Sequence, residues 1–137
     1  MAHWHIFYLS RMKEIIFTSK APAPIGPYSQ AVKVGNTLYV SGQIPIDPAT
    51  GSLVTINILR ETNQVMHNLM AILQEAGMDF SHVVKTTIYL SDMDNFSSVN
   101  ETYSEYFTED FPARETVQVS RLPKDVNVEI SVVAVKM

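Results

Sequence analysis

The sequence has no cysteine among its 137 residues, and its ten lysines and arginines leave a formal net charge of −4. Without cysteine the chain forms no disulfide, no thiolate metal site and no cysteine nucleophile. The scattered positive charges argue against a nucleic-acid partner, which usually needs a basic face. A local basic patch formed on folding is the alternative. No apolar run reaches the about 18 residues that a membrane span requires.

Histidines are also few, and they are not arranged as metal ligands. The four are His3, His5, His67 and His82, with no HExxH spacing and no surrounding carboxylate cluster. We therefore predict no metal site.

What the chain does contain is core-forming material for one domain. Hydrophobic residues make up 46% and charged residues 18%, which favours a packed fold over disorder. We expect a single domain over residues 12–137 and a cytoplasmic protein. Met1–Arg11 differs in character and is too short for a signal sequence, so we interpret it as an added or upstream-start extension before Met12. A targeting segment is the less favoured alternative.

Hydrophobic periodicity predicts the order β-ββ-α-β-α-ββ. The predicted strands are Lys13–Thr18, Ala31–Val34, Thr37–Ser41, Val83–Leu90, Glu115–Ser120 and Val126–Val135. One helix carries the apolar stripe Ile58, Val65, Leu69, Ile72, Leu73 and Ala76, and the other runs from Asn95 to Phe107. This order predicts an α+β fold, a two-layer sandwich with both helices on one face of a mixed sheet.

Turn and cap residues support these boundaries. Gly35-Asn36 fits a two-residue type II′ hairpin, and Asp47–Gly51 fits a turn. Gly77 is placed to end the first helix in the left-handed C′ position, and Asp94 is predicted to be the N-cap of the second.

The last predicted strand is apolar on both sides. Val128, Ile130 and other residues line one side, while Val133 and Val135 lie on the other. A thin domain with two apolar sheet faces suggests that another subunit buries the second face.

Three polar residues are candidates for chemistry. Arg114 offers a rigid donor fork that matches a carboxylate, although a surface arginine is the ordinary alternative. Glu129 points opposite to Val128 and Ile130, where desolvation would raise its pKa toward a value useful in acid–base catalysis; a solvated face or a paired charge is a comparable interpretation. Asn100, beside the apolar stripe of its helix, binds either a ligand or nearby backbone groups.

Three further candidates lie earlier in the chain. Tyr28 either walls a pocket or packs in the core. Ser41 has no histidine partner in a hydrolase motif, so we do not expect it to be a nucleophile. Gly42 is suited to a close approach between its backbone and a ligand.

Six motifs in order along the chain resemble the reactive intermediate deaminase family (RidA, also called YjgF). They are Ala23-Pro-Ile-Gly-Pro-Tyr-Ser-Gln30, Val40-Ser-Gly-Gln-Ile-Pro45, Val84-Lys-Thr-Thr87, Val99-Asn100, Phe111-Pro-Ala-Arg114 and Arg121-Leu-Pro-Lys-Asp-Val126. The resemblance covers about residues 12–137.

The resemblance implies a chorismate-mutase-like fold and a homotrimer whose sheets form a central barrel, with clefts between neighbouring subunits. It implies cofactor-free hydrolysis of enamine/imine intermediates, such as 2-aminoacrylate, to 2-keto acids and ammonia. Alternatives are a keto-acid-binding regulatory module without turnover, a translation-inhibiting ribonuclease, which the acidic balance and the absence of a histidine pair disfavour, and a holdase-like structural role.

The resemblance also implies roles for single residues. Arg114 matches the arginine that holds the substrate carboxylate, and Glu129 matches the carboxylate associated with the attacking water. The pocket residues of the family match Tyr28, Ser41, Gly42 and Asn100. Thr116 stands where many members have a cysteine. Imine hydrolysis needs no thiol, so we interpret Thr116 as a tolerated change in the pocket wall.

Overall fold

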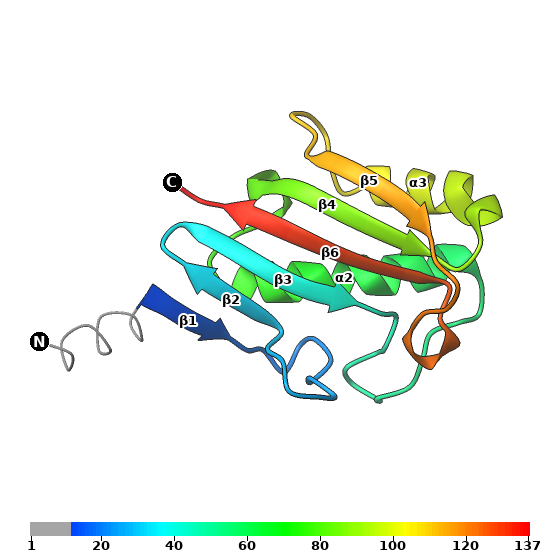
Figure 1. Cartoon of the computed structure of the whole chain (residues 1–137), viewed down its shortest axis with the longest axis horizontal. Coiled ribbons are helices and arrows are strands. Elements are labelled where there is room, and N and C mark those ends of the chain that lie inside the picture. The colour runs from blue at the N-terminus through cyan, green and yellow to red at the C-terminus, as the bar shows by residue number, and fades with distance from the viewer. Residues whose placement is uncertain (1–11) are drawn as a thin grey trace, which may run out of the picture.

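The computed structural model describes residues 12–137, so the predicted extension Met1–Arg11 lies outside the described residues. One six-stranded sheet runs in the order β1-β2-β3-β6-β4-β5 (Figure 1). Its strands are β1 (Lys13–Ile16), β2 (Ala31–Val34), β3 (Thr37–Gln43), β4 (Val83–Leu90), β5 (Ala113–Gln118) and β6 (Val128–Val135). Only β4 and β5 pair in parallel, so the sheet is mixed. The predicted α+β class and element order are confirmed.

Helix α2 (Ile58–Glu75) forms where the periodic stripe predicts it. The side chain of Asn57 caps its start by accepting the N–H of Arg60 at 2.9 Å. Its end is the predicted one: Gly77 has φ +74° and donates its N–H to Gln74. Only glycine adopts this left-handed C′ conformation without strain.

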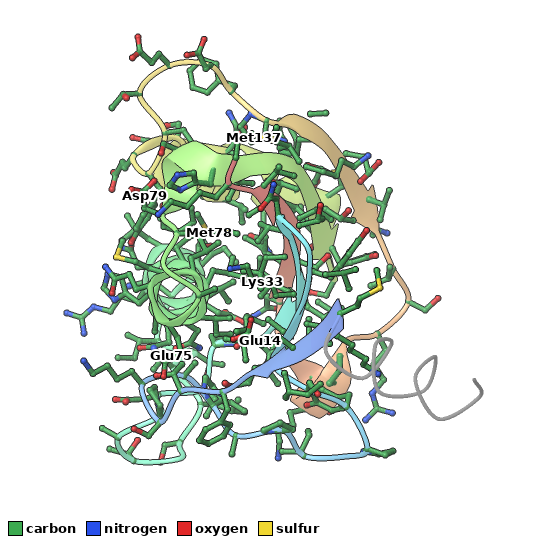
Figure 2. All side chains as sticks on the ribbon, turned by 90° about the vertical axis from the view of Figure 1, so that its left-hand side faces the viewer. Glu14, Lys33, Glu75, Met78, Asp79 and Met137 are labelled. Atoms are coloured by element: carbon green, nitrogen blue, oxygen red, sulfur yellow. The ribbon has the colours of Figure 1, made fainter. Side chains whose placement is uncertain are left out.

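The core lies between the sheet and its two helices, α2 and α3 (Phe96–Ser104), which cover the same face. Figure 2 views the molecule from the side, with α2 on one side of the sheet. The buried strand residues on this face include Leu38, Ile88, Leu90, Val128 and Ile130. Substituting one such leucine or isoleucine with alanine typically lowers the free energy of unfolding by about 2–5 kcal/mol.

The opposite sheet face, which we call the open face, is covered by neither α2 nor α3. Tyr39 and Ile15 point to it and are each 54% exposed. Val133 and Val135 also lie there, half-buried. The second apolar face predicted from the last strand is therefore present on the described chain.

The β2–β3 connection is the predicted two-residue hairpin, since Val34 pairs with Thr37. Gly35 alone of its two central residues has a positive φ, of +58°, as a type II′ turn requires. The predicted turn at residues 47–51 is also present, closed by a 2.8 Å bond from the N–H of Gly51 to the carbonyl of Asp47.

The second helix differs from its prediction at both ends. Asp94 is not its N-cap: Asp92 instead accepts the N–H of Asp94 at 2.9 Å and caps a 3₁₀ turn, Met93–Asn95, from which α3 continues. The helix ends at Ser104, yet Phe107 remains buried. Periodicity overextended the helix, because a turn returning to the core also buries an aromatic residue.

Several strand boundaries also shift, two of them because a side chain captures a backbone N–H. β3 continues to Gln43, and β5 ends at Gln118 rather than at residue 120. β1 ends at Ile16, since the N–H of Thr18 binds Gln30 Oε1 at 2.8 Å. β6 begins at Val128 rather than at residue 126, since the N–H of Asn127 goes to the Glu61 carboxylate. β5 starts early, at Ala113, so Arg114 is a strand residue rather than a loop residue.

None of the described helices is both long and apolar enough to cross a membrane.

Candidate active site

Arg114 is held by one face of α3. It pairs with Thr86 across β4 and β5, which turns its side chain toward the helices. Its Nη1 donates to Asn100 Oδ1 at 2.8 Å. The guanidinium carbon lies 5.8 Å from the ring centre of Phe96 and 5.1 Å from that of Tyr103. Helical spacing places these three residues on one side, so together they fix the guanidinium by a hydrogen bond and two cation–π contacts.

Tyr103 is itself anchored. Its hydroxyl donates to Thr86 Oγ1 at 3.0 Å in the core. Burial raises the pKa of Tyr103, so its hydroxyl stays protonated and keeps donating. We call Arg114, Phe96, Asn100 and Tyr103 the arginine half-site.

A cavity of about 190 Å³ adjoins the arginine half-site. It is lined by Asn100, Tyr103, Ser104, Phe111, Pro112 and Arg114. Drug-sized ligands occupy about 300–1,000 Å³, so this space suits a small metabolite. A guanidinium at the wall of a mostly apolar cavity is an arrangement that binds a small carboxylate.

Thr116 lies two residues after Arg114 on the same strand face and pairs with Ile88. Its hydroxyl oxygen is buried and has no hydrogen-bond partner within residues 12–137. A buried hydroxyl left unpaired destabilises by about 1–3 kcal/mol.

Glu129 projects to the open face, as its alternation with Val128 and Ile130 predicts. Burial raises the pKa of its carboxyl group. Gly42 makes room for it: a Cβ at that position would lie 2.7 Å from Glu129 Oε2 and 2.8 Å from Cδ. The close approach between Gly42 and a ligand stays a prediction, and the atoms that Gly42 makes room for in the described chain are those of the Glu129 carboxylate, which any side chain at this position would displace.

Ser41 and Tyr28 stand beside this pair. The Ser41 hydroxyl donates to the carbonyl of Ser29 at 2.6 Å, which buttresses the loop that carries Tyr28. Tyr28 is half exposed and accepts the N–H of Ile25 at 3.2 Å. Tyr28 and Gly42 line a common small cavity of about 30 Å³. We call Glu129, Gly42, Ser41 and Tyr28 the glutamate half-site.

The two half-sites lie on opposite faces of the sheet. Arg114 shares the buried helix-side face with Thr86, whereas Glu129 pairs with Tyr89 on the open face. Within one chain, Arg114 and Glu129 therefore do not point toward each other.

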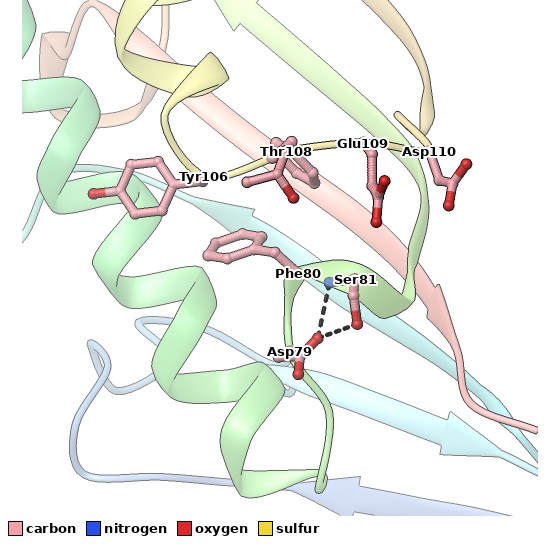
Figure 3. Close-up of a pocket in the computed structure, with 8 residues that line it drawn as sticks. Asp79, Phe80, Ser81, Tyr106, Thr108, Glu109 and Asp110 are labelled. Atoms are coloured by element: carbon pink, nitrogen blue, oxygen red, sulfur yellow. Dashed lines mark hydrogen bonds between the residues drawn. The ribbon is translucent and has the colours of Figure 1, made fainter.

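A larger cavity, of about 360 Å³, lies elsewhere and contains none of the predicted site residues. Figure 3 shows Asp79, Glu109 and Asp110 around it, with Asp79 hydrogen-bonded to Ser81. That bonding lowers the pKa of Asp79, so the wall stays negative. Such a wall repels a carboxylate.

A family model described as "Endoribonuclease L-PSP" matches residues 18–136. The chain belongs to this family. Among curated relatives, it is 58% identical to a RutC family protein of Pyrococcus abyssi, over 90% of this chain and 98% of the relative. It is 49% identical to the human 2-iminobutanoate/2-iminopropanoate deaminase, over 93% of each chain.

Solved structures of similar proteins carry the name YjgF and related names. The YjgF gene product of E. coli matches with a TM-score of 0.87 and 43% identity, over 90% of this chain and 99% of that one. E. coli TdcF with bound serine matches with a TM-score of 0.88 and 38% identity, over 91% and 100%. The resemblance to the RidA (YjgF) family is confirmed.

Two parts of this RidA-family site were missed in the sequence. Phe96 and Tyr103 lie within the predicted second helix but were not among the predicted site residues; their spacing with Asn100 was the available signal. Gln30 holds the loop before Tyr28 by donating to the carbonyls of Thr18 at 3.0 Å and Pro22 at 2.9 Å. No sequence signal distinguishes such a buried amide from a surface glutamine.

The described residues contain no cluster of three or more histidines and carboxylates suited to a metal ion.

Proposed function

We propose that this protein hydrolyses 2-imino acids, such as 2-iminopropanoate and 2-iminobutanoate, to 2-keto acids and ammonia. Relatives that are 49–50% identical to this chain, the human protein among them, carry the name of this deaminase. The observation that carries the proposal is the held guanidinium of Arg114 beside a cavity of small-metabolite size. The serine bound in the similar TdcF structure has the same α-carboxylate that Arg114 would bind.

We place the reaction in a cleft between subunits of a homotrimer. The arginine half-site of one copy would face the glutamate half-site of another, because the two point away from each other in a single chain. The apolar residues of the open face supply a surface for this association. A cytoplasmic location remains part of the proposal.

The residues then divide the chemistry. Arg114 binds the carboxylate and fixes the imine carbon, with Tyr28 and Thr116 as pocket walls. Glu129 takes a proton from water as the water oxygen bonds to the C=N carbon, and passes this proton to the nitrogen, which gives a neutral carbinolamine. Glu129 then takes the proton of the new hydroxyl group and passes it to the nitrogen as the C=O bond forms, and ammonia leaves. Orientation supplies much of the rate gain, since imines already hydrolyse in water. These groups complete the reaction without a cofactor.

A raised pKa suits Glu129 to this exchange. Desolvation makes its carboxylate a stronger base than an exposed glutamate, so it takes the proton from water more readily. It still releases the proton later, because its conjugate acid stays a far stronger acid than water.

The test is keto-acid release from an imine generated by a pyridoxal-phosphate dehydratase or an amino-acid oxidase. Wild type should accelerate release, and Arg114→Ala should lose about 10²–10⁴-fold in kcat/KM, corresponding to two charge-assisted hydrogen bonds. Arg114→Lys keeps the charge without the fork and should fall between them. An Arg114→Ala variant as fast as wild type would refute the anchoring role.

A ribonuclease is the second candidate, because the matching family model carries that description. Of the two histidines in residues 12–137, His82 accepts the N–H of Asp79 in a turn and His67 contacts Tyr106, so neither joins a half-site. RNA cleavage that persists through repurification and disappears in Glu129→Gln would favour this candidate over imine hydrolysis.

A further inference from the structure

Glu61 is a buried carboxylate that belongs to neither half-site. It lies in the first turn of α2 and is 1% exposed. Both its oxygens accept from Asn127: the backbone N–H reaches Oε1 at 2.6 Å, and Nδ2 reaches Oε2 at 3.0 Å. A buried carboxylate needs such donors, and the N-terminal end of a helix also favours negative charge.

Asn127 joins this carboxylate to the end of a second strand. Its carbonyl accepts the N–H of Ser91 at 3.2 Å, and its Oδ1 accepts the Ser91 hydroxyl at 3.0 Å. Ser91 directly follows β4 and Asn127 directly precedes β6. Three elements therefore meet at Asn127, and the capture of its N–H by Glu61 sets the residue at which β6 begins.

Glu129 follows two residues later and has little freedom to move. Its carboxylate packs against Gly42 so closely that a single added carbon would overlap it. A small displacement of the start of β6 would press this carboxylate into β3 or draw it away. The placement of Glu129 depends on where the strand is pinned.

We infer that Glu61 is a positioning residue for Glu129: it holds Asn127, fixes the start of β6, and so sets where the carboxylate of Glu129 meets water. This role rests on the proposed imine hydrolysis, in which Glu129 exchanges a proton with water. Catalytic geometry is sensitive to such support, since a misplacement of about 1 Å can lower a rate about 10²-fold.

The first variant is Glu61→Gln, which keeps the shape but turns an N–H₂ toward the donating Nδ2 of Asn127. A partial shift of β6 should lower kcat about tenfold, less than the full misplacement effect. The Kd of 2-ketobutyrate, measured by calorimetry, should stay within about twofold, because Arg114 lies on another strand. A purely structural role would not lower kcat while leaving the Kd of 2-ketobutyrate unchanged.

The second variant tests the pair itself. In Glu61→Gln combined with Asn127→Asp, the new amide donates to the new carboxylate, the backbone N–H keeps its acceptor, and Ser91 still donates. This double variant should recover most of the lost kcat. The matched control is Thr62→Val, the neighbouring buried residue whose hydroxyl binds only Ile58 within α2, and it should keep wild-type kcat.

Wild-type kcat in Glu61→Gln overturns the inference, and so does a double variant no faster than the single one. If Glu61→Gln does not fold, Ser91→Ala removes another tether from Asn127 and should lower kcat in the same direction by less; unchanged kcat there also overturns it. Loss in the single variant and recovery in the double support it. A wild-type protein that hydrolyses no imine overturns the proposed function instead, and this inference with it.

Discussion

The arginine and glutamate half-sites differ in how the surrounding residues treat the charge of the central side chain. The charge of Arg114 is satisfied inside one chain, by Asn100 and two aromatic rings of α3. The carboxylate of Glu129 is half-buried on the open face, and its pKa is raised by burial alone. A binding group works best when it is held and charged, whereas a base works best when its charged form is less stabilised. The contrast supports the proposal that the arginine half-site binds the substrate and the glutamate half-site reacts with it.

If Glu129 is the base, Glu129→Gln should cause the largest loss of turnover among the variants considered. Its kcat should fall about 10²–10⁴-fold, the usual contribution of a general base, while 2-ketobutyrate binding at Arg114 should change little. Wild-type kcat should also fall as the pH drops through the raised pKa of Glu129, since only the carboxylate accepts a proton. A variant that lost binding instead of turnover would reverse the two roles.

The same variant also tests the direction in which the stability of the protein changes with pH. A raised pKa means that the folded protein holds this proton more tightly than the unfolded chain. Wild type therefore loses stability relative to Glu129→Gln as the pH rises from the ordinary carboxyl pKa through the raised one. The Tm advantage of the variant should be larger at neutral pH than in acid.

Gly42→Ala should give the next largest effect, because its Cβ would meet Glu129 Oε2 at 2.7 Å. Displacing this carboxylate should lower kcat about 10²-fold, and the overlap should lower stability by about 1–3 kcal/mol. Gly51→Ala is the control: it has φ +75° and no neighbour within 4 Å, so it should lose about 1–2 kcal/mol but no kcat. Equal kcat losses in both variants would show that only stability matters.

Much of the fold could be predicted because its signals are local. The helix stop at Gly77 and the hairpin at Gly35-Asn36 depend on backbone conformations that few other residues adopt. The errors at the end of β1 and the start of β6 arose instead from bonds to side chains distant in sequence. The predicted β6 included Asn127 because nothing nearby in the sequence shows that Glu61, far along the chain, captures its N–H.

The candidate site could be predicted as a set of residues but not as an arrangement. Alternation placed Glu129 opposite Val128, yet it could not place Arg114 relative to either. That needs the pairing of Thr86 with Arg114, and strand register is decided by contacts distant in sequence. The separation of the half-sites onto two faces was therefore beyond sequence pattern.

Tyr103 should affect binding more than turnover if the arginine half-site is an anchor. Tyr103→Leu removes the ring 5.1 Å from the guanidinium, and the loss of a partly desolvated cation–π contact of about 1–2 kcal/mol should raise KM about tenfold. Tyr103→Phe keeps the ring and loses only the bond to Thr86 Oγ1, so KM should stay near wild type. If both variants raise KM equally, the hydroxyl rather than the ring supports Arg114.

Thr116→Val should have the smallest effect on activity, and it can change stability in the favourable direction. Its hydroxyl is buried without a partner in the described chain, so replacing it with a methyl group removes an unpaired polar atom. Stability should rise by about 1 kcal/mol, and KM should stay within about threefold if Thr116 is only a pocket wall. Thr86→Val makes the same change one strand away, where the hydroxyl accepts from Tyr103, and should lose about 1 kcal/mol. A large rise in KM in Thr116→Val would instead mean that its hydroxyl bonds the substrate, making the arginine half-site a hydrogen-bonding surface as well as a charge anchor.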